Sequence, residues 1–299
     1  MIAATRGARV VEVEAQAKVN LRLRILAREA SGFHQIETLF LRLALSDTIR
    51  VRRTDGRCHL DVRGDVDLRA IGPAEHNLAW RAASAYLSAT NQQSTGFDIQ
   101  IDKRIPLGAG LGGGSADAGA VLRALDAMSD QPIGEDGVVA LAATLGSDVP
   151  FMASEQALAL GWGRGERLLG LPPLPARECA LVVPSFAINT AEAYQWMAES
   201  RGESVVGMLV HLETVQDWWQ VPSIATNDFE VVVGARYPAI RRYVQGLKDA
   251  GCEIAMMSGS GSVVFGIGPE RGADTVLKVG DRLIRTLTAS RVEPVCRIE

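Results

Sequence analysis

The sequence predicts an α+β protein of two domains, with helices packed on largely antiparallel sheets. First, its 299 residues are about twice the length of an average domain. Second, apolar and polar residues alternate from Val11 to Ile25, as they do in one half-buried strand or in two joined strands. Third, strand-like and helix-like segments mix in the second half, where SGSGS (258–262) separates two apolar runs.

The first half of the chain begins with strands and continues with a capped helix. The alternation from Val11 to Ile25 places Lys18 and Asn20 on the same polar face, about 7 Å apart along the strand. Asn77 is suited to cap a helix, because apolar residues recur at helical spacing after it. The segment FDIQI (97–101) alternates again and predicts a further strand.

A glycine-rich segment, PLGAGLGGGSADAG (106–119), follows this strand directly. A helix is expected after it, with Ser115 as the N-cap residue. A second short helix is expected to end at Gly146, and the stretch from Ser147 to Pro150 is expected to lead into a strand.

The composition becomes irregular and proline-rich around residues 165–179, which predicts a boundary between domains 1–170 and 171–299. In the second domain we expect a strand at ALVVP (180–184), then a helix over 190–200 and helices between Asn227 and Gly251. A strand–turn–strand unit is expected over 255–268, and a helix around Ala273–Thr286 before a final strand.

Composition and charge exclude several classes of protein. The chain has 31 Lys and Arg against 35 Asp and Glu and no basic stripe, which argues against a nucleic-acid or anionic-membrane partner held by bulk charge. Its four cysteines form no close pair, and neither a signal peptide nor a membrane-spanning apolar run is seen. The four histidines lack the spacing of metal ligands, so no transition-metal site is expected. These observations predict a cytoplasmic protein.

The glycine-rich segment is open to three chemistries. It contains GxGxxG, but a dinucleotide fold needs a buried parallel strand before the loop and another strand after the helix. A Walker loop would end in Gly-Lys-Ser or Gly-Lys-Thr, and this segment does not. A flexible linker is the alternative without function. The pattern favours a different phosphate cradle, in which backbone N–H groups and a helix N-terminus meet phosphate oxygens.

This segment resembles the PxxxGLGGGSSDA signature of the GHMP kinases. Further motifs narrow the resemblance to the branch that phosphorylates 4-diphosphocytidyl-2-C-methyl-D-erythritol. Nine occur in that branch's order and span most of the chain, among them AKVNLRLRIL (17–26), SGFHQIETLF (31–40), LGSDVPFM (145–152) and SGSGSVVFG (258–266). Three positions depart from the usual pattern, namely Phe33, Ala116 and Ser147.

The resemblance implies a two-lobed GHMP kinase fold, with an N-terminal domain like domain 2 of ribosomal protein S5 and a ferredoxin-like C-terminal domain. It implies transfer of the ATP γ-phosphate to the 2-hydroxyl of this small-molecule substrate, with Mg²⁺ arriving on ATP. The resemblance assigns catalysis to Lys18 and Asp148, and substrate binding to Asn20, Phe33, His34 and Tyr194. It assigns ATP binding to Pro106, Leu107, Gly108, Ala109, Gly110, Leu111, Gly112, Gly113, Gly114, Ser115 and Ala116.

Each assignment has a structural alternative. Lys18 could be a solvated strand lysine, and Asp148 could merely form a turn before Pro150. Ser115 could cap the helix only, or also reach phosphate or Mg²⁺. Phe33 and Tyr194 could hold a cytosine ring between them across the interdomain cleft, or could be ordinary core residues.

Two other functions stay open at this point: a GHMP kinase for a different alcohol, and a silent ATP-binding sensor. The catalytic hypothesis requires the Lys18 ammonium and the Asp148 carboxylate to lie within about 4 Å of each other, or to share one substrate oxygen. The sequence does not decide between a monomer and a homodimer.

Overall fold

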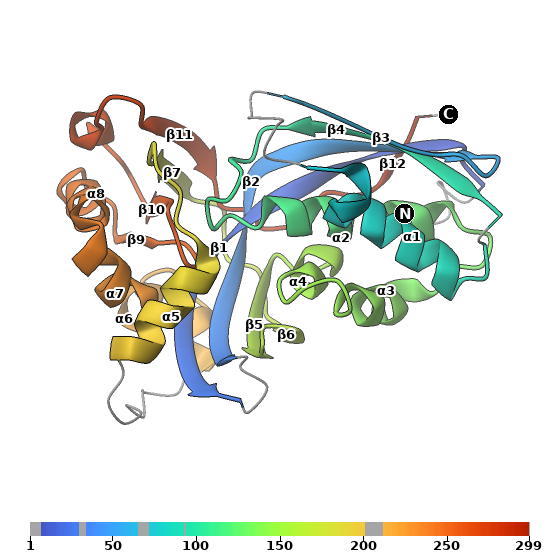
Figure 1. The fold of residues 1–299 in the computed structure, drawn as a ribbon. Coiled ribbons are helices and arrows are strands. Elements are labelled where there is room, and N and C mark those ends of the chain that lie inside the picture. The colour runs from blue at the N-terminus through green and yellow to red at the C-terminus, as the bar shows by residue number, and fades with distance from the viewer. Residues whose placement is uncertain (1–6, 30–33, 65–71, 93, 201–211, 299) are drawn as a thin grey trace.

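The computed structural model describes residues 7–29, 34–64, 72–92, 94–200 and 212–298, which form two sheets and the helices around them (Figure 1). The first sheet has eight strands: β1 Val10–Arg28, β2 His34–Thr54, β3 Cys58–Gly64, β4 Gly96–Lys103, β5 Leu158–Gly163, β6 Arg167–Gly170, β8 Thr226–Asn227 and β12 Cys296–Arg297. Its main order is β12-β1-β2-β4-β3, with β5 on β2, β6 on β5 and β8 parallel to β1. The α+β prediction is confirmed.

The long β1–β2 hairpin connects the two halves of the molecule. Its strands pair antiparallel, with Lys18 opposite Arg42, and in Figure 1 they run in blue between the two lobes. The far end of the hairpin supplies Leu23, Ile25 and Ile36 to the apolar core of the second lobe. The hairpin therefore belongs to both cores, which fixes the lobes on either side of it.

The polar face of β1 is buried, whereas a half-buried strand would leave it in water. Gln16, Lys18, Asn20 and Arg22 are each less than 5% exposed. Later parts of the chain cover them: Gln16 bonds the backbone of residues 291 and 293, and Arg22 Nη1 donates to the carbonyl of Ile224. A solvated Lys18 is thus excluded by tertiary packing that strand periodicity does not reveal.

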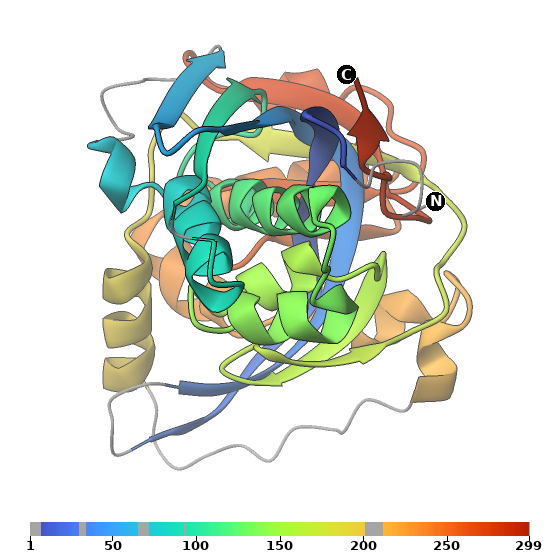
Figure 2. The same cartoon turned by 90° about the vertical axis from the view of Figure 1, so that its right-hand side faces the viewer.

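Helices cover the first sheet on one side (Figures 1 and 2). Asn77 caps the helix α1 (Leu78–Ala89), as predicted, since its Oδ1 accepts a hydrogen bond from the N–H of Ala79. The strand predicted at FDIQI is also present, as β4. These helices are η3 Ala74–His76, α1 Leu78–Ala89, α2 Gly113–Met128, α3 Gly134–Ala142 and α4 Val149–Ala153.

Three local predictions in this half are wrong. The N-cap of α2 is Gly112 rather than Ser115, because Gly112 adopts φ +70° and turns the chain into the helix ahead of the serine. α3 ends at Ala142, ahead of Gly146. Pro150 is the second residue of the short helix α4 and does not lead directly into a strand, which is consistent with the preference of proline for the first turn of a helix.

The second sheet has four strands in the order β11-β7-β10-β9: β7 Glu178–Val183, β9 Ile254–Met257, β10 Val264–Ile267 and β11 Arg282–Leu287. The helices of this half are α5 Thr190–Ser200, η4 Leu212–Val215, α6 Val221–Ile224, α7 Phe229–Arg236, α8 Pro238–Asp249 and η5 Ala273–Val276. The helix expected around Ala273–Thr286 is wrong, because a single 3₁₀ turn ends at Val276 and β11 follows on the free edge of β7.

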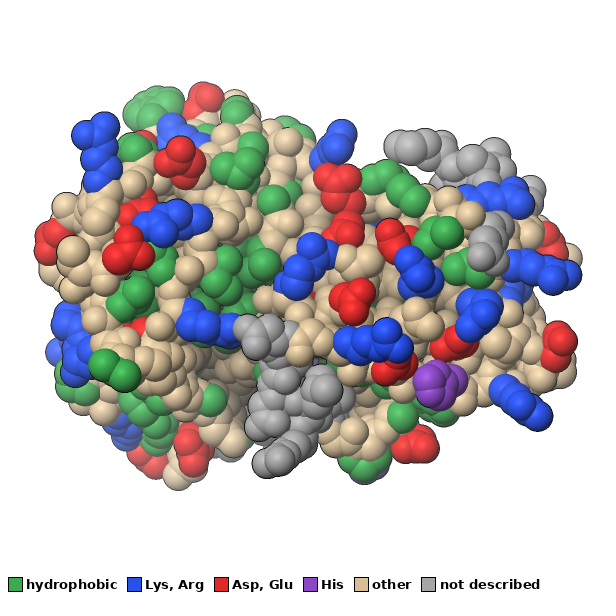
Figure 3. Space-filling view, turned by 90° about the horizontal axis from the view of Figure 1, so that it is seen from above, with side chains coloured by type: hydrophobic (Ala, Val, Ile, Leu, Met, Phe, Trp, Pro, Cys, Tyr) green, Lys and Arg blue, Asp and Glu red, His purple; other side chains and the backbone are tan. Residues whose placement is uncertain are grey.

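The domain division at residue 170 stays a prediction. Two late segments, β8 and β12, pair with β1 in the first sheet, so the chain crosses between the lobes more than once. In the described part of the chain, no helix is both long and apolar enough to cross a membrane. Acidic and basic side chains are interspersed on the face that Figure 3 shows.

Candidate active site

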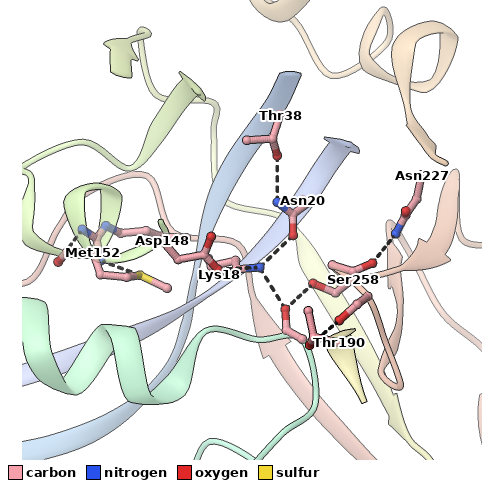
Figure 4. A network of polar contacts seen from close by, with 12 residues as sticks. Lys18, Asn20, Thr38, Asp148, Met152, Thr190, Asn227 and Ser258 are labelled. Atoms are coloured by element: carbon pink, nitrogen blue, oxygen red, sulfur yellow. Dashed lines mark hydrogen bonds and ion pairs between the residues drawn. The ribbon is translucent and has the colours of Figure 1, made fainter. Parts of the chain in front are cut away.

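An ion pair between Lys18 and Asp148 lies between the lobes (Figure 4). The Lys18 Nζ is 3.3 Å from Asp148 Oδ2, so the predicted separation of about 4 Å or less is confirmed. The ammonium also donates to Asn20 Oδ1 at 2.7 Å and to the carbonyl of Gly110 at 3.0 Å. The Lys18 side chain is 4% exposed and that of Asp148 33%. The pair therefore combines a buried, fixed cation with a carboxylate that solvent or a ligand can reach.

The Asp148 carboxylate is not used to hold the turn in which it sits. Asp148 occupies the N-cap position of α4, but its side chain makes no capping hydrogen bond. Within the described residues, this carboxylate makes its ion pair with Lys18. Its remaining lone pairs are available to accept a hydrogen bond from a hydroxyl group. A residue that served only to form the turn would not need them.

A buried arginine that sequence reasoning missed, Arg42, holds α4 in place. It is 1% exposed, and its Nη2 donates to the carbonyls of Phe151, Met152 and Ser154 at 2.7–3.1 Å, while Nε reaches that of Gln156. Burial, with a smaller contribution from Arg123, lowers the pKa of Arg42 to about 9. Its place between two leucines in an alternating strand was the available signal, since a charged residue beside a core must have a partner.

The glycine-rich segment wraps around the end of the Lys18 side chain. A Cβ on Gly112 would lie 2.6 Å from Met152 Cε and 3.1–3.2 Å from carbons of Lys18. Gly108, Gly110 and Gly112 all have positive φ, which L side chains rarely adopt. The N-terminus of α2 follows at once, so unpaired backbone N–H groups and the positive end of the helix dipole converge here. The geometry is that of an anion cradle.

A loop from the second sheet closes the cradle from the other side. Ser258 Oγ donates to the carbonyl of Gly110 at 2.9 Å, and the N–H of Val263 donates to that of Ala109 at 3.2 Å. A Cβ on Gly110 would meet the Ser258 carbonyl at 2.2 Å. Asn227 fixes this loop by donating to the carbonyls of Met257 and Gly259. The two lobes therefore share one polar network at the site (Figure 4).

A second lysine–aspartate cluster lies beneath the start of α2. Lys103 Nζ contacts Asp47 Oδ2 at 2.5 Å and Asp117 Oδ2 at 2.7 Å, and all three side chains are at most 4% exposed. Burial raises the pKa of Asp117 well above its ordinary value, an effect that Lys103 opposes and Asp47 reinforces. Asp47 also accepts from the N–H groups of Arg104 and Ile105, just ahead of the glycine-rich segment. The cluster ties β4 to α2 and so fixes both ends of the loop.

Two of the three predicted base-binding residues meet across the lobes. The rings of His34 on β2 and Tyr194 on α5 stack at a centroid distance of 4.8 Å, and Tyr194 also packs edge-on against Phe229. Burial and then the charge of Asp148 raise the pKa of Tyr194 to about 12, which places the phenol within electrostatic reach of the ion pair. Phe33, the third residue, lies outside the described residues.

Comparisons with known proteins agree with this geometry. Residues 77–156 match the N-terminal domain of the GHMP kinases, and residues 215–282 match their C-terminal domain. The 4-diphosphocytidyl-2-C-methyl-D-erythritol kinase of Solibacter usitatus is 36% identical to the chain, over 89% of this chain and 83% of its own length. That of Moorella thermoacetica is 35% identical, over 93% of this chain and 96% of its own length. The chain belongs to this family of GHMP kinases. The predicted family and two-lobed fold are confirmed.

A solved structure of a family member has the same architecture. A crystal structure of 4-(cytidine 5'-diphospho)-2C-methyl-D-erythritol kinase aligns with a TM-score of 0.74 at 33% identity, covering 93% of this chain and 98% of that one. As a GHMP kinase, the chain is expected to use ATP, and the glycine-rich segment is the place in the described structure that suits its phosphates.

The oxygen donors near the cradle are few. Among residues 7–29, 34–64, 72–92, 94–200 and 212–298, no three His, Cys, Asp or Glu side chains converge as metal ligands. The partly exposed Asp148 carboxylate pairs with Lys18 beside the cradle, and Ser115 lies in the first turn of α2. This arrangement fits a Mg²⁺ ion that is bound mainly by nucleotide phosphates and contacts at most one or two protein oxygens.

Proposed function

We propose that this protein transfers the γ-phosphate of ATP to the 2-hydroxyl of 4-diphosphocytidyl-2-C-methyl-D-erythritol. The observation that carries the proposal is the Lys18–Asp148 pair, whose ammonium also bonds the glycine-rich segment at Gly110. The buried Lys18 ammonium thereby contacts both Asp148, which can accept a hydrogen bond from a hydroxyl group, and the glycine-rich segment, which can hold phosphates. A pure ATP-binding sensor has no need of the exposed carboxylate.

The two residues have different parts in the reaction. The Asp148 carboxylate accepts a hydrogen bond from the substrate hydroxyl and orients its oxygen toward the phosphoryl group. The Lys18 ammonium, held by Asn20 and Gly110, stabilises the negative charge on the phosphoryl oxygens during transfer. Because Lys18 is fixed before substrate binds, this stabilisation needs little reorganisation.

ATP is held by residues Pro106–Ala116, with the backbone of Gly108–Gly112 and the first turn of α2 against its phosphates. Asp148 and Ser115 are the protein oxygens that would hold a Mg²⁺ ion arriving on ATP, and such an ion would supply positive charge to the phosphates. The loop must keep side chains out of the path of the phosphates. Three of its residues with positive φ are glycines, which carry no side chain and adopt this backbone conformation readily.

The cytidyl group is recognised between the lobes. Tyr194 provides a ring face, His34 provides ring nitrogens for hydrogen bonds, and Asn20 lies beside the reacting hydroxyl. Phe33 is proposed as the second stacking partner, since stacking requires an aromatic face and not a hydroxyl group. A cytoplasmic location and a monomeric or homodimeric state remain part of the proposal.

A substrate panel tests the proposal directly. The purified protein is incubated with ATP, Mg²⁺ and either the cytidyl substrate, homoserine or mevalonate, and ADP release is measured. We expect turnover with the cytidyl substrate alone, and a new phosphomonoester on its 2-hydroxyl in the ³¹P NMR spectrum. Turnover with another alcohol would indicate a different GHMP kinase, whereas ATP binding without turnover on any alcohol would indicate a sensor.

A further inference from the structure

A cavity of about 600 Å³ lies at the opposite end of α2 from the glycine-rich segment. Arg123 lines it, ten residues beyond Gly113, which corresponds to about 15 Å along the helix axis. Figure 2 views the molecule from this side. Because none of the proposed ATP-binding or substrate-binding residues lines the cavity, it is separate from the candidate active site.

The cavity has the size and the character of a small-molecule site. Its walls come from α2, the start of α3, the end of α4 and the segment after it, the segment that follows β6, and the segment that leads into β12. Apolar side chains such as Val138, Pro173 and Val295 form much of the lining. The wall nearest the C-terminus is fixed by hydrogen bonds, since Arg123 Nη2 donates to the carbonyl of Glu293 at 2.6 Å and Gln16 accepts from the N–H of Glu293.

One cation in this wall forms no close ion pair among the described residues. Arg123 Nη2 donates to the carbonyl of Glu293, and no ion pair within 4.0 Å joins Arg123 to a carboxylate in the described part of the chain. Burial lowers the pKa of its guanidinium, and the more distant Glu155, Glu135 and Glu293 only oppose this effect. A half-buried guanidinium without an ion pair is stabilised by any anion that reaches it.

The other charged groups of the wall are already engaged or turned to solvent. The Asp126 carboxylate accepts from the hydroxyl of Tyr86 and from the N–H groups of Ile133 and Gly134. Glu135 accepts from the N–H of Glu155, and the Glu155 residue is exposed. Arg291 pairs with Glu293 at the exposed rim.

We propose that this cavity is a second ligand site, which accepts a small amphipathic monoanion with its acid group on Arg123 and its apolar part against Val138 and Val295. A planar guanidinium suits a carboxylate or sulfonate, because it can donate two parallel hydrogen bonds. The apolar walls favour a ligand with a hydrocarbon or aromatic body over inorganic phosphate.

The site is connected to Asp148 through α4. Asp148 precedes this five-residue helix, while Ala153 at its end and Gln156 beyond it line the cavity. Arg42 bonds both the helix and the carbonyl of Gln156, which links the cavity wall to α4. A ligand in the cavity therefore changes the placement of Asp148, and with it kcat, more than the binding of ATP. This consequence rests on the proposed kinase function, whereas binding itself does not.

Fluorescence titration with 1-anilinonaphthalene-8-sulfonate, an aromatic monoanion, tests the site on the full chain. We expect saturable binding of one probe per protein, with a Kd unchanged by saturating ATP. Arg123→Leu should weaken binding at least about tenfold, because it removes a charge-assisted hydrogen bond. Ala127→Phe, which fills the cavity from α2, should abolish it. Arg81→Leu, at an exposed arginine on α1 outside the cavity, is the matched control and should leave the Kd within about twofold.

Three results would overturn the proposal: no saturable binding, displacement of the probe by ATP, or equal affinity in the wild type and in Ala127→Phe. If Arg123→Leu does not fold, as judged by circular dichroism, the Kd of the probe is measured with Arg123→Lys and Ala127→Phe instead. Saturating probe should also change kcat at constant KM for ATP. Binding with unaltered kcat in an active enzyme would contradict the connection through α4, and an enzyme inactive without probe would instead contradict the proposed function.

Discussion

Two lysine–aspartate centres flank the glycine-rich segment, and they differ in what their carboxylates have left to bind. At the first, Lys18 is buried and Asp148 is 33% exposed; at the second, Lys103, Asp47 and Asp117 are all at most 4% exposed. Both lysines lie against the loop, since a Cβ on Gly112 would meet Lys18 and one on Gly113 would lie 3.4 Å from Lys103 Nζ. The same residue types thus serve two purposes at neighbouring positions.

Both centres contain the same residue types, so residue type does not distinguish them. The solvent exposure of the carboxylate distinguishes the reacting pair from the supporting cluster. Asp148 contacts Lys18 and keeps lone pairs open to solvent, so a substrate hydroxyl can reach it. Asp117 is closed off with one oxygen, Oδ1, lacking a hydrogen-bond partner among the described residues. A substrate cannot use a carboxylate so enclosed. The central claim is therefore that the open pair carries catalysis and that the closed cluster carries stability.

Loss of the lysine in the closed cluster should have the largest effect on stability. Lys103→Met leaves the Asp47 and Asp117 carboxylates buried without a cation, and breaking a buried ion pair in this way typically costs about 3–5 kcal/mol. We expect the urea midpoint to fall accordingly. Lys278→Met, at a lysine outside both centres, is the control and should change stability by less than about 0.5 kcal/mol. A stable Lys103→Met enzyme would refute the structural assignment.

Loss of the lysine in the open pair should act mainly on turnover. Lys18→Met keeps a side chain of similar length but removes the cation near the phosphoryl group, so kcat should fall about 10²–10³-fold. The KM for ATP should rise less, because the backbone of the glycine-rich segment is unaltered. Steady-state kinetics at saturating cytidyl substrate measures both constants. A fall in kcat below tenfold would show that Lys18 does not stabilise the transition state.

Much of this contrast could be predicted from the sequence, and part of it could not. The pairing of Lys18 with Asp148 follows from motifs that resemble a known family, and Lys18 and Asn20 share a face because strands have a period of two. The closed cluster joins residues 47, 103 and 117, whose meeting depends on the register of β2 against β4 and on the direction of α2.

Other features depend in the same way on tertiary structure. Arg42 holds α4 through backbone carbonyls, which have no sequence signature. The segment 282–287 is mistaken for helix because its local residues tolerate either state, and its strand form is decided by the free edge of β7. Gly112 replaces Ser115 as the cap because the loop requires a left-handed residue there.

The stacked rings test whether the open pair also binds the base. Tyr194→Ala should raise the KM for the cytidyl substrate roughly tenfold, since base–aromatic stacking contributes about 1–3 kcal/mol. ATP affinity should stay within about twofold, because the glycine-rich segment is unaffected. Tyr237→Ala, which removes a stacked aromatic ring beside Phe186 in the same lobe, is the control. A lower melting temperature with unchanged KM would make Tyr194 a core residue.

The pH dependence of stability should separate the closed cluster from an ordinary ion pair. The pKa of Asp117 is raised above its ordinary 3.8 mainly by burial, so its contribution to stability is full below that value and is lost as the pH rises. Asp117→Asn cannot ionise, so its free energy of unfolding in urea should increase relative to that of the wild type as the pH rises above 3.8. This is the smallest effect expected.

Asp98 supplies the control of opposite sign. Burial opposes the effect, but hydrogen bonds from Arg52 and His59 lower the pKa of Asp98, so its contribution is present above 3.8 and is lost as the pH falls. Asp98→Asn should therefore lose stability relative to the wild type as the pH rises through this range. The same trend in both variants would show that the surroundings of Asp117 do not raise its pKa.

Single-turnover phosphoryl transfer by Asp148→Asn tests the central claim most directly. The variant keeps the size of the side chain but loses the carboxylate, so the rate of transfer in a rapid-quench experiment should fall by about two to four powers of ten. ATP affinity should stay within about twofold, and Asp136→Asn, at an exposed position on α3, should match the wild type in both. A transfer rate equal to that of the wild type would contradict the claim that the open pair carries catalysis.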